Sequence, residues 1–200
     1  MKTVAVFGGT FNPIHKGHTE IIAALSQKPE ISKIILMPTK IPPHKTVDFL
    51  ADERHRVNMC NIIADKFNNV EVSDLELKRV GKSYTIDTVS ELKRLYPDSK
   101  IAITIGADMV VTFSEWKNYQ ALINEVKIFA FGRNTISDDE FKKGIVFLKS
   151  IGADIECINK TIPNISSTEI RMNLQNNNDS SKLLDSEIYE YIISNNIYGA

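Results

Sequence analysis

The sequence of 200 residues has few of the groups that bridge or strongly charge a chain: two cysteines, and a formal net charge of −1. Cys60 and Cys157 lie in separate apolar segments without C-x-x-C spacing, which argues against a disulfide scaffold and predicts two buried thiols in a reducing compartment. A net charge so near zero provides no global field to attract nucleic acid or an anionic membrane. Any site for an anion must therefore be local.

Long apolar runs are also missing. No stretch approaches the roughly 20 residues that span a bilayer, and the N-terminus enters a strand pattern without a charged and apolar leader. These absences predict a soluble cytoplasmic protein that binds neither membranes nor nucleic acid. The length fits a single domain, residues 1–200, with a substantial core. The sequence leaves open whether the chain forms a homo-oligomer.

What is present is an alternation of strand and helix patterns along almost the whole chain. Short apolar runs predict strands at residues 3–7, 33–37, 70–72, 100–106, 126–131 and 154–158. Apolar residues at helical spacing predict helices after residue 18 and at 52–67, 84–96, 113–123, 141–148, from 168 onward and at 187–194. This alternation predicts an α/β fold, a doubly wound parallel sheet with helices on both faces and a small C-terminal helical part.

The first strand leads into a glycine turn that contains two histidines, residues 8–18, GGTFNPIHKGH. A strand, a glycine turn and a helix N-terminus form the usual place where an α/β protein holds phosphate. Gly8 and Gly9 let a ligand approach the backbone closely. His15 and His18 are three residues apart, so on a helix they share one face and both can donate to an anion. The stretch predicts an anion site with its own histidines.

Other interpretations of this turn are weaker. The spacing is neither G-x-G-x-x-G nor that of a P-loop, since Glu76 stands where a P-loop ending in Gly81-Lys82-Ser83 needs its first glycine. His15 and His18 could bind a metal, but no cysteine or acid stands nearby in the sequence to complete the site. We therefore predict no protein-held metal. The remaining alternative is an ordinary loop with exposed histidines.

Two further stretches have the chemistry of phosphate binding. Residues 165–171, ISSTEIR, place hydroxyls at a helix N-terminus, with Arg171 one turn further on; the alternative is a helix cap with a solvated arginine. Residues 42–45, PPHK, predict a rigid loop with two potential cations, or else a plain surface turn. We assign Arg54 and Arg56 to a solvated helix face and give His55 no role.

Together these motifs resemble the nucleotidyltransferase superfamily with the H-x-G-H signature, and in detail the nicotinate-nucleotide adenylyltransferases. Asn12 and Ile14 stand where that family commonly has Asp and Pro. Residues 83–88, SYTIDT, resemble the segment that lines its nicotinate pocket, and the tryptophan at 116 after Gly106-Ala107-Asp108 resembles its pyridine-stacking residue, although a lone tryptophan is more often core. The likeness extends to the closing helix and weakens at Arg133, which receives no role.

The resemblance implies a Rossmann-like nucleotidyltransferase fold and the transfer of AMP from ATP to nicotinate mononucleotide, with Mg²⁺ carried on ATP. The catalytic residues that it implies are His15, His18, Lys45 and Arg171. The ATP-binding residues are Gly8, Gly9, Thr10, Phe11, His18, Asp108, Ile165, Ser166, Ser167, Thr168 and Arg171. The mononucleotide-binding residues are Gly9, Thr10, Asn12, His15, Lys45, Tyr84, Thr85 and Trp116.

Four alternatives to this activity stay open. A nicotinamide mononucleotide adenylyltransferase differs by one substrate group, and Thr85 at a helix N-terminus favours the acid. Phosphopantetheine adenylyltransferases share the H-x-G-H core but lack the SYTIDT and tryptophan features. A class I aminoacyl-tRNA synthetase would need more chain to recognise tRNA. A non-enzymatic nucleotide-binding regulator would not need both histidines, Lys45 and Arg171.

Overall fold

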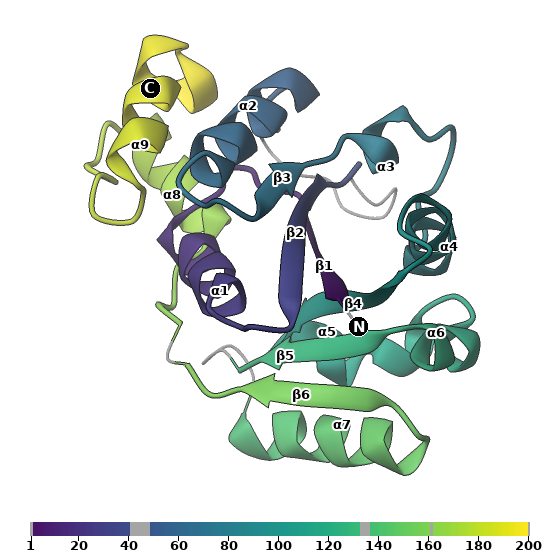
Figure 1. Cartoon of the computed structure of the whole chain (residues 1–200). Coiled ribbons are helices and arrows are strands. Elements are labelled where there is room, and N and C mark those ends of the chain that lie inside the picture. The colour runs from purple at the N-terminus through teal and green to yellow at the C-terminus, as the bar shows by residue number, and fades with distance from the viewer. Residues whose placement is uncertain (1, 41–48, 133–136, 161, 200) are drawn as a thin grey trace.

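The computed structural model describes residues 2–40, 49–132, 137–160 and 162–199. Its centre is a parallel sheet, for which these residues give the strand order β3-β2-β1-β4-β5-β6 (Figure 1). The strands are β1 Lys2–Gly9, β2 Ile31–Pro38, β3 Val70–Val72, β4 Ser99–Gly106, β5 Lys127–Phe131 and β6 Asp154–Ile158. All the predicted strands are confirmed. The chain winds outward on both sides of β1, so the loops after β1 and β4 diverge and leave space at their carboxyl ends.

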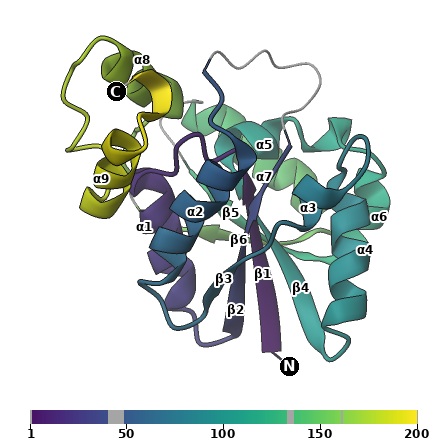
Figure 2. The same cartoon turned by 90° about the horizontal axis from the view of Figure 1, so that it is seen from above.

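Helices cover both faces of the sheet, as predicted (Figures 1 and 2). The helices are α1 Lys16–Ser26, α2 Glu53–Ala64, α3 Leu75–Lys78, α4 Thr85–Leu95, α5 Ala107–Val111, α6 Tyr119–Glu125, α7 Asp138–Ser150, α8 Ser167–Gln175 and α9 Ser186–Ser194, with 3-10 turns η1 Phe113–Glu115 and η2 Ile197–Gly199. Helices α1, α2, α8 and α9 pack on one face, and α4 to α7 pack on the other. No helix in the described ranges has the length and apolar character needed to cross a membrane.

Strand β1 shows why its sequence reads as one apolar run. Its alternate side chains enter two different core clusters: Ala5 and Phe7 pack towards α1 and α9, while Val4 and Val6 pack towards α4 and α6. A strand buried on both faces has no polar side to alternate with. Burying a valine or phenylalanine side chain contributes about 1.5–3 kcal/mol relative to leaving it exposed. The central strands therefore hold the sheet rigid beneath the loops at its carboxyl edge.

Two predictions about local structure are wrong. The helix expected at 113–123 is divided into η1 and α6, because Trp116 is extended and Asn118 adopts a left-handed conformation with φ 53°; asparagine tolerates this region better than most residues. The thiol of Cys157 is exposed, not buried, because it lies on β6 at the edge of the sheet. Cys60 is buried as predicted, and its burial raises the pKa of its thiol.

Candidate active site

The turn after β1 brings its two histidines into direct contact. His15 is the N-cap of α1, and its backbone N–H donates to Nδ1 of His18 at 3.2 Å. The two rings stack with their centroids 3.8 Å apart. Since Nδ1 of His18 accepts a hydrogen bond, the neutral ring has its proton on Nε2. The backbone therefore fixes the tautomer of His18 in which Nε2 is a donor.

The glycine between the two histidines is required by close packing. A Cβ at Gly17 would lie 3.0 Å from Cε1 of His15 and 3.3 Å from the carbonyl oxygen of Pro163. Both distances are shorter than normal carbon contacts. Gly17 therefore lets the His15 ring and the segment before α8 approach the first turn of α1 together.

The N-terminus of α8 is hydrogen-bonded to the same turn. The hydroxyl of Ser167 donates to the carbonyl oxygen of Pro13 at 2.9 Å, and Nη1 of Arg171 donates to the carbonyl oxygen of Asn12 at 2.9 Å. Nη2 of Arg171 donates to the hydroxyl of Thr168 at 3.3 Å. Arg171 is only 8% exposed. A solvated arginine is therefore the wrong interpretation, and the two motifs converge even though 159 positions separate Asn12 from Arg171.

The side chain of Asn12 is occupied by bonds within the protein. Its Oδ1 accepts from the hydroxyl of Tyr198 at 2.7 Å and from the backbone N–H of Ala51 at 3.0 Å. Its Nδ2 donates to the carbonyl oxygen of Phe49 at 3.3 Å, a bond that an aspartate could not make. Sequence reasoning missed Tyr198 as a support of the motif, because nothing local indicates which loop a C-terminal tyrosine will meet.

Arg56 corrects the prediction of a solvated helix face. Arg54 is exposed, but the side chain of Arg56 is fully buried. Its Nη1 donates to the carbonyl oxygens of Thr10 at 2.7 Å and of Thr39 at 2.9 Å. Helix α2 thus reaches under the ends of β1 and β2. The helical pattern gave no signal for this, because Arg56 stands among charged residues in the sequence.

Two cavities adjoin at the carboxyl edge of the sheet. The Arg171 cavity has a volume of about 570 Å³ and lies between the glycine turn (residues 8–18) and α8. The Trp116 cavity has a volume of about 690 Å³ and lies between β1, β4, α4, the residues just after β2 and Trp116. The residues that line both are Gly8, Gly9, Thr10, Thr104, Ile105 and Met109. The glycine turn is therefore a wall that the two cavities share.

The predicted site residues divide between these cavities. The Arg171 cavity contains all the predicted ATP-binding residues: Gly8, Gly9, Thr10, Phe11, His18, Asp108, Ile165, Ser166, Ser167, Thr168 and Arg171. Of the predicted mononucleotide-binding residues, the Trp116 cavity contains Gly9, Thr10, Tyr84, Thr85 and Trp116. Asn12 and His15 line the Arg171 cavity instead. Lys45 of the PPHK loop and Arg133 lie outside the described residues.

The Trp116 cavity combines aromatic faces with polar groups. Trp116 is half-buried and stacks on Phe113 with ring centroids 4.9 Å apart. Lys117 places its Nζ 4.1 Å from the centroid of the Tyr84 ring. Helix α4 begins at Thr85, as expected, so its first N–H groups lie at this cavity. The cavity therefore offers a flat aromatic surface beside the positive end of a helix.

Three polar residues near this cavity, Glu76, Arg79 and Lys40, were missed from the sequence. The buried carboxylate of Glu76 accepts from the hydroxyl of Thr88 at 2.7 Å, and Nη1 of Arg79 donates to that hydroxyl at 2.9 Å. Lys40 donates from Nζ to the carbonyl oxygen of Arg79 at 2.7 Å. These bonds connect α3, α4 and the residues just after β2 beside the cavity. Among the described residues, no group of three or more His, Cys, Asp or Glu side chains is arranged to hold a metal ion.

The H-x-G-H motif lies at the point where the strand order reverses, beside two cavities. The model of the cytidylyltransferase-like family matches residues 6–173, so the chain is a nucleotidyltransferase of this class. A probable nicotinate-nucleotide adenylyltransferase of Carboxydothermus hydrogenoformans is 34% identical over 98% of this chain and 97% of its own. A second, of Fusobacterium nucleatum, is 35% identical over 94% and 96%. The chain belongs to the nicotinate-nucleotide adenylyltransferase family.

The fold is shared with a solved structure. Plasmodium falciparum nicotinic acid mononucleotide adenylyltransferase complexed with NaAD is similar with a TM-score of 0.82 over 100% of this chain and 98% of that one. Its sequence identity is 24%. The Rossmann-like nucleotidyltransferase fold expected from the resemblance is thereby confirmed.

Proposed function

We propose that this protein transfers AMP from ATP to nicotinate mononucleotide, giving deamido-NAD and pyrophosphate. The observation that supports this most strongly is the pair of adjoining cavities with Gly8, Gly9 and Thr10 as their common wall. A reaction that joins two nucleotides through their phosphates needs two sites that meet where the phosphates react. The family and its named relatives support the choice of substrates.

ATP is assigned to the Arg171 cavity. Its triphosphate would meet Nε2 of His18, the N-terminus of α8 and the guanidinium of Arg171, all of which donate to anions. Asp108 lines the same cavity and suits the ribose hydroxyls. Mg²⁺ enters as part of the substrate, held by phosphate oxygens and water, as is usual for this ion. Lys45 is proposed to add a further positive charge from the PPHK loop.

Nicotinate mononucleotide is assigned to the Trp116 cavity. The ring of Trp116 offers a face on which an electron-poor pyridine can stack. The N–H groups at Thr85, where α4 begins, suit a carboxylate. Because a neutral amide gains less from a helix N-terminus, this assignment favours the acid over nicotinamide mononucleotide. Asn12 and His15, which line the Arg171 cavity, are retained as proposed mononucleotide contacts.

The chemistry requires alignment and charge neutralisation more than a base. A phosphate oxygen of the mononucleotide attacks the α-phosphorus of ATP, the bond from that phosphorus to the bridging oxygen of the β-phosphate breaks, and pyrophosphate leaves. The attacking phosphate has its last pKa near ~6, so it is ionised at neutral pH. His15, His18, Lys45 and Arg171 are proposed to neutralise charge on the α-phosphate and the leaving pyrophosphate.

The test is a comparison of acceptors. Purified protein is incubated with ATP, Mg²⁺ and, in separate reactions, nicotinate mononucleotide, nicotinamide mononucleotide or phosphopantetheine, and pyrophosphate release is measured. The proposal expects the highest kcat/KM with nicotinate mononucleotide. A higher value with one of the other acceptors would replace the assignment. Nucleotide binding without turnover in any of the reactions would indicate a regulator.

A further inference from the structure

Arg56 on α2 joins the two strand ends that border the proposed substrate sites. Its Nη1 donates to the carbonyl oxygens of Thr10, just after β1, and of Thr39, just after β2, at 2.7 and 2.9 Å. The same strand ends are linked by the N–H of Thr39, which donates to the carbonyl oxygen of Gly9 at 2.9 Å. Thr10 and Thr39 both line the Trp116 cavity, and Thr10 also lines the Arg171 cavity.

Burying the guanidinium of Arg56 without a charged partner costs free energy. Arg56 is 0% exposed, and within the part of the chain that the structure describes it forms no ion pair. Its Nε and Nη2 are also buried without a hydrogen-bond partner among those residues. Burial lowers the pKa of Arg56, yet an arginine stays protonated in proteins. A methionine of similar size would avoid the cost of burying an unpaired charge.

The geometry of the turn indicates what the charge does. In a trans peptide the C=O and the following N–H point in opposite directions, so the bond from Arg56 to the carbonyl oxygen of Thr10 directs the N–H of Phe11 away from the guanidinium. Phe11 has φ 48°, a conformation that non-glycine residues adopt only when their surroundings hold it. Phe11 also lines the Arg171 cavity.

We propose that Arg56 is a positioning residue for nucleotide binding: it holds the Thr10–Phe11 peptide in its anion-binding orientation and adds positive charge beneath the wall shared by the two cavities. The inference rests on the proposed function for the identity of its ligands. It assigns to Arg56 no contact with the substrates.

The test compares Arg56→Met and Arg56→Lys with a matched control, Arg54→Met, which removes an exposed arginine from the same helix. kcat, both KM values and the thermal midpoint are measured for each variant. We expect Arg56→Met to lower kcat/KM for ATP at least tenfold, Arg56→Lys to recover part of this loss because it keeps the charge, and Arg54→Met to stay within twofold of wild type.

A merely structural arginine would give a different result. The thermal midpoint of Arg56→Met would change while kcat and both KM values of the folded enzyme stayed within twofold of wild type, and this would overturn the inference. If Arg56→Met does not fold, Arg56→Lys is decisive, because unchanged kinetic constants in that variant would also overturn it.

A calorimetric measurement separates this inference from the proposed function. If the wild-type protein shows no turnover with any acceptor, the proposed function fails, but binding of Mg·ATP can still be measured. At least tenfold weaker binding to Arg56→Met than to Arg54→Met would support the positioning role. Equal affinities would refute it.

Discussion

At the scale of single residues, the site is supported by buried polar side chains that bond to loops far away in the sequence. Tyr198 is 6% exposed, and its hydroxyl donates to Oδ1 of Asn12 at 2.7 Å. Burial raises the pKa of Tyr198, so the hydroxyl remains protonated and a donor at physiological pH. Asn12 in turn accepts from the N–H of Ala51, which follows the undescribed residues of the PPHK loop. Tyr198, near the C-terminus, is thus bonded directly to the glycine turn.

This predicts a measurable cost for Tyr198→Phe. Removing the hydroxyl leaves Oδ1 of Asn12 with one donor instead of two, so the free energy of unfolding should fall by about 1–2 kcal/mol. Urea denaturation followed by circular dichroism measures this change. Tyr189→Phe, on the neighbouring helix α9, is a suitable control because no hydrogen bond of its hydroxyl is seen among the described residues. A loss of equal size in both variants would contradict the assignment.

His18 is the residue whose removal should affect turnover most directly. Loss of one donor to developing charge typically lowers kcat by about 10²–10³-fold, and we expect a loss of that size for His18→Ala without loss of the fold. Steady-state pyrophosphate release and a circular dichroism spectrum together test this. His55→Ala is the matched control, because His55 bonds to Tyr191 outside both cavities. Near-normal turnover in His18→Ala would refute the role of His18.

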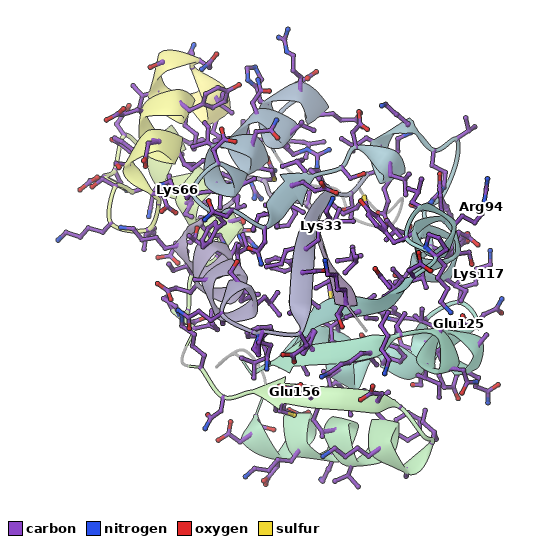
Figure 3. All side chains as sticks on the ribbon, in the orientation of Figure 1. Lys33, Lys66, Arg94, Lys117, Glu125 and Glu156 are labelled. Atoms are coloured by element: carbon purple, nitrogen blue, oxygen red, sulfur yellow. The ribbon has the colours of Figure 1, made fainter. Side chains whose placement is uncertain are left out.

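At the scale of elements, the edge strand β6 is attached to the sheet by an ion-pair cluster at the opposite end from the cavities. Glu156 (Figure 3) forms an ion pair with Lys127 on β5 at 2.6 Å and another with Lys28. Hydrogen bonds from Lys127 and Lys28 lower the pKa of Glu156. The ionised carboxylate is therefore favoured in the folded state. Because the side chain of Glu156 is 36% exposed, solvent screens these pairs.

Glu156→Gln should therefore reduce stability by no more than about 1 kcal/mol at neutral pH. A carboxyl with a lowered folded-state pKa contributes stability above its unfolded pKa and loses it as the pH falls through the folded value. The difference between wild type and Glu156→Gln should accordingly begin to shrink below the ordinary pKa of about 4.5, and it should disappear once the pH is below the lowered folded-state pKa. Urea denaturation at several pH values, with the exposed Glu190→Gln as control, measures this. A stability difference that grew as the pH fell would contradict the predicted pH dependence.

At the scale of the whole molecule, the two cavities occupy one edge of the sheet and are built from segments spread over the chain. Residues from the ends of β1 and β4 meet there with the N-termini of α4 and α8. A ligand that spans both cavities should contact and stabilise all of these segments. A ligand confined to one cavity should stabilise fewer of them.

Deamido-NAD should consequently raise the thermal midpoint of the protein. A ligand at one hundred times its Kd adds about 2.7 kcal/mol to stability, which for a chain of this length corresponds to roughly 5–10 °C. Differential scanning fluorimetry measures the shift. Hydrogen exchange should become slower both at residues 83–88, which line the Trp116 cavity, and at residues 165–171, which line the Arg171 cavity. Protection of only one of these segments would contradict a product site that spans both cavities.

Much of this architecture could be predicted from the sequence because it depends on local patterns. The strands are apolar runs, and α8 begins where Ser166 caps it, accepting from the N–H of Thr168 at 3.2 Å. Most of the residues proposed to bind ATP could be selected because they lie in two short contiguous stretches, 8–18 and 165–171, and the structure places both stretches at one cavity. The prediction of one helix at 113–123 failed because the helical spacing of apolar residues continues past Asn118 in the sequence. The left-handed backbone of Asn118 interrupts the helix there. The prediction that Cys157 is buried failed because the strand order decides which strand lies at the edge of the sheet. The spacing of apolar residues in the sequence does not reveal that order.

The sequence by itself determined the order of strands and helices, the family, and the two motifs, residues 8–18 and 165–171, that are proposed to bind phosphate. Only the tertiary structure decided that Arg171 meets Asn12, that Arg56 is buried under Thr10 and Thr39, and that two cavities share the glycine turn. The physical reason is that periodicity and capping are properties of neighbouring residues. The burial and partners of a polar side chain depend instead on which distant elements pack around it.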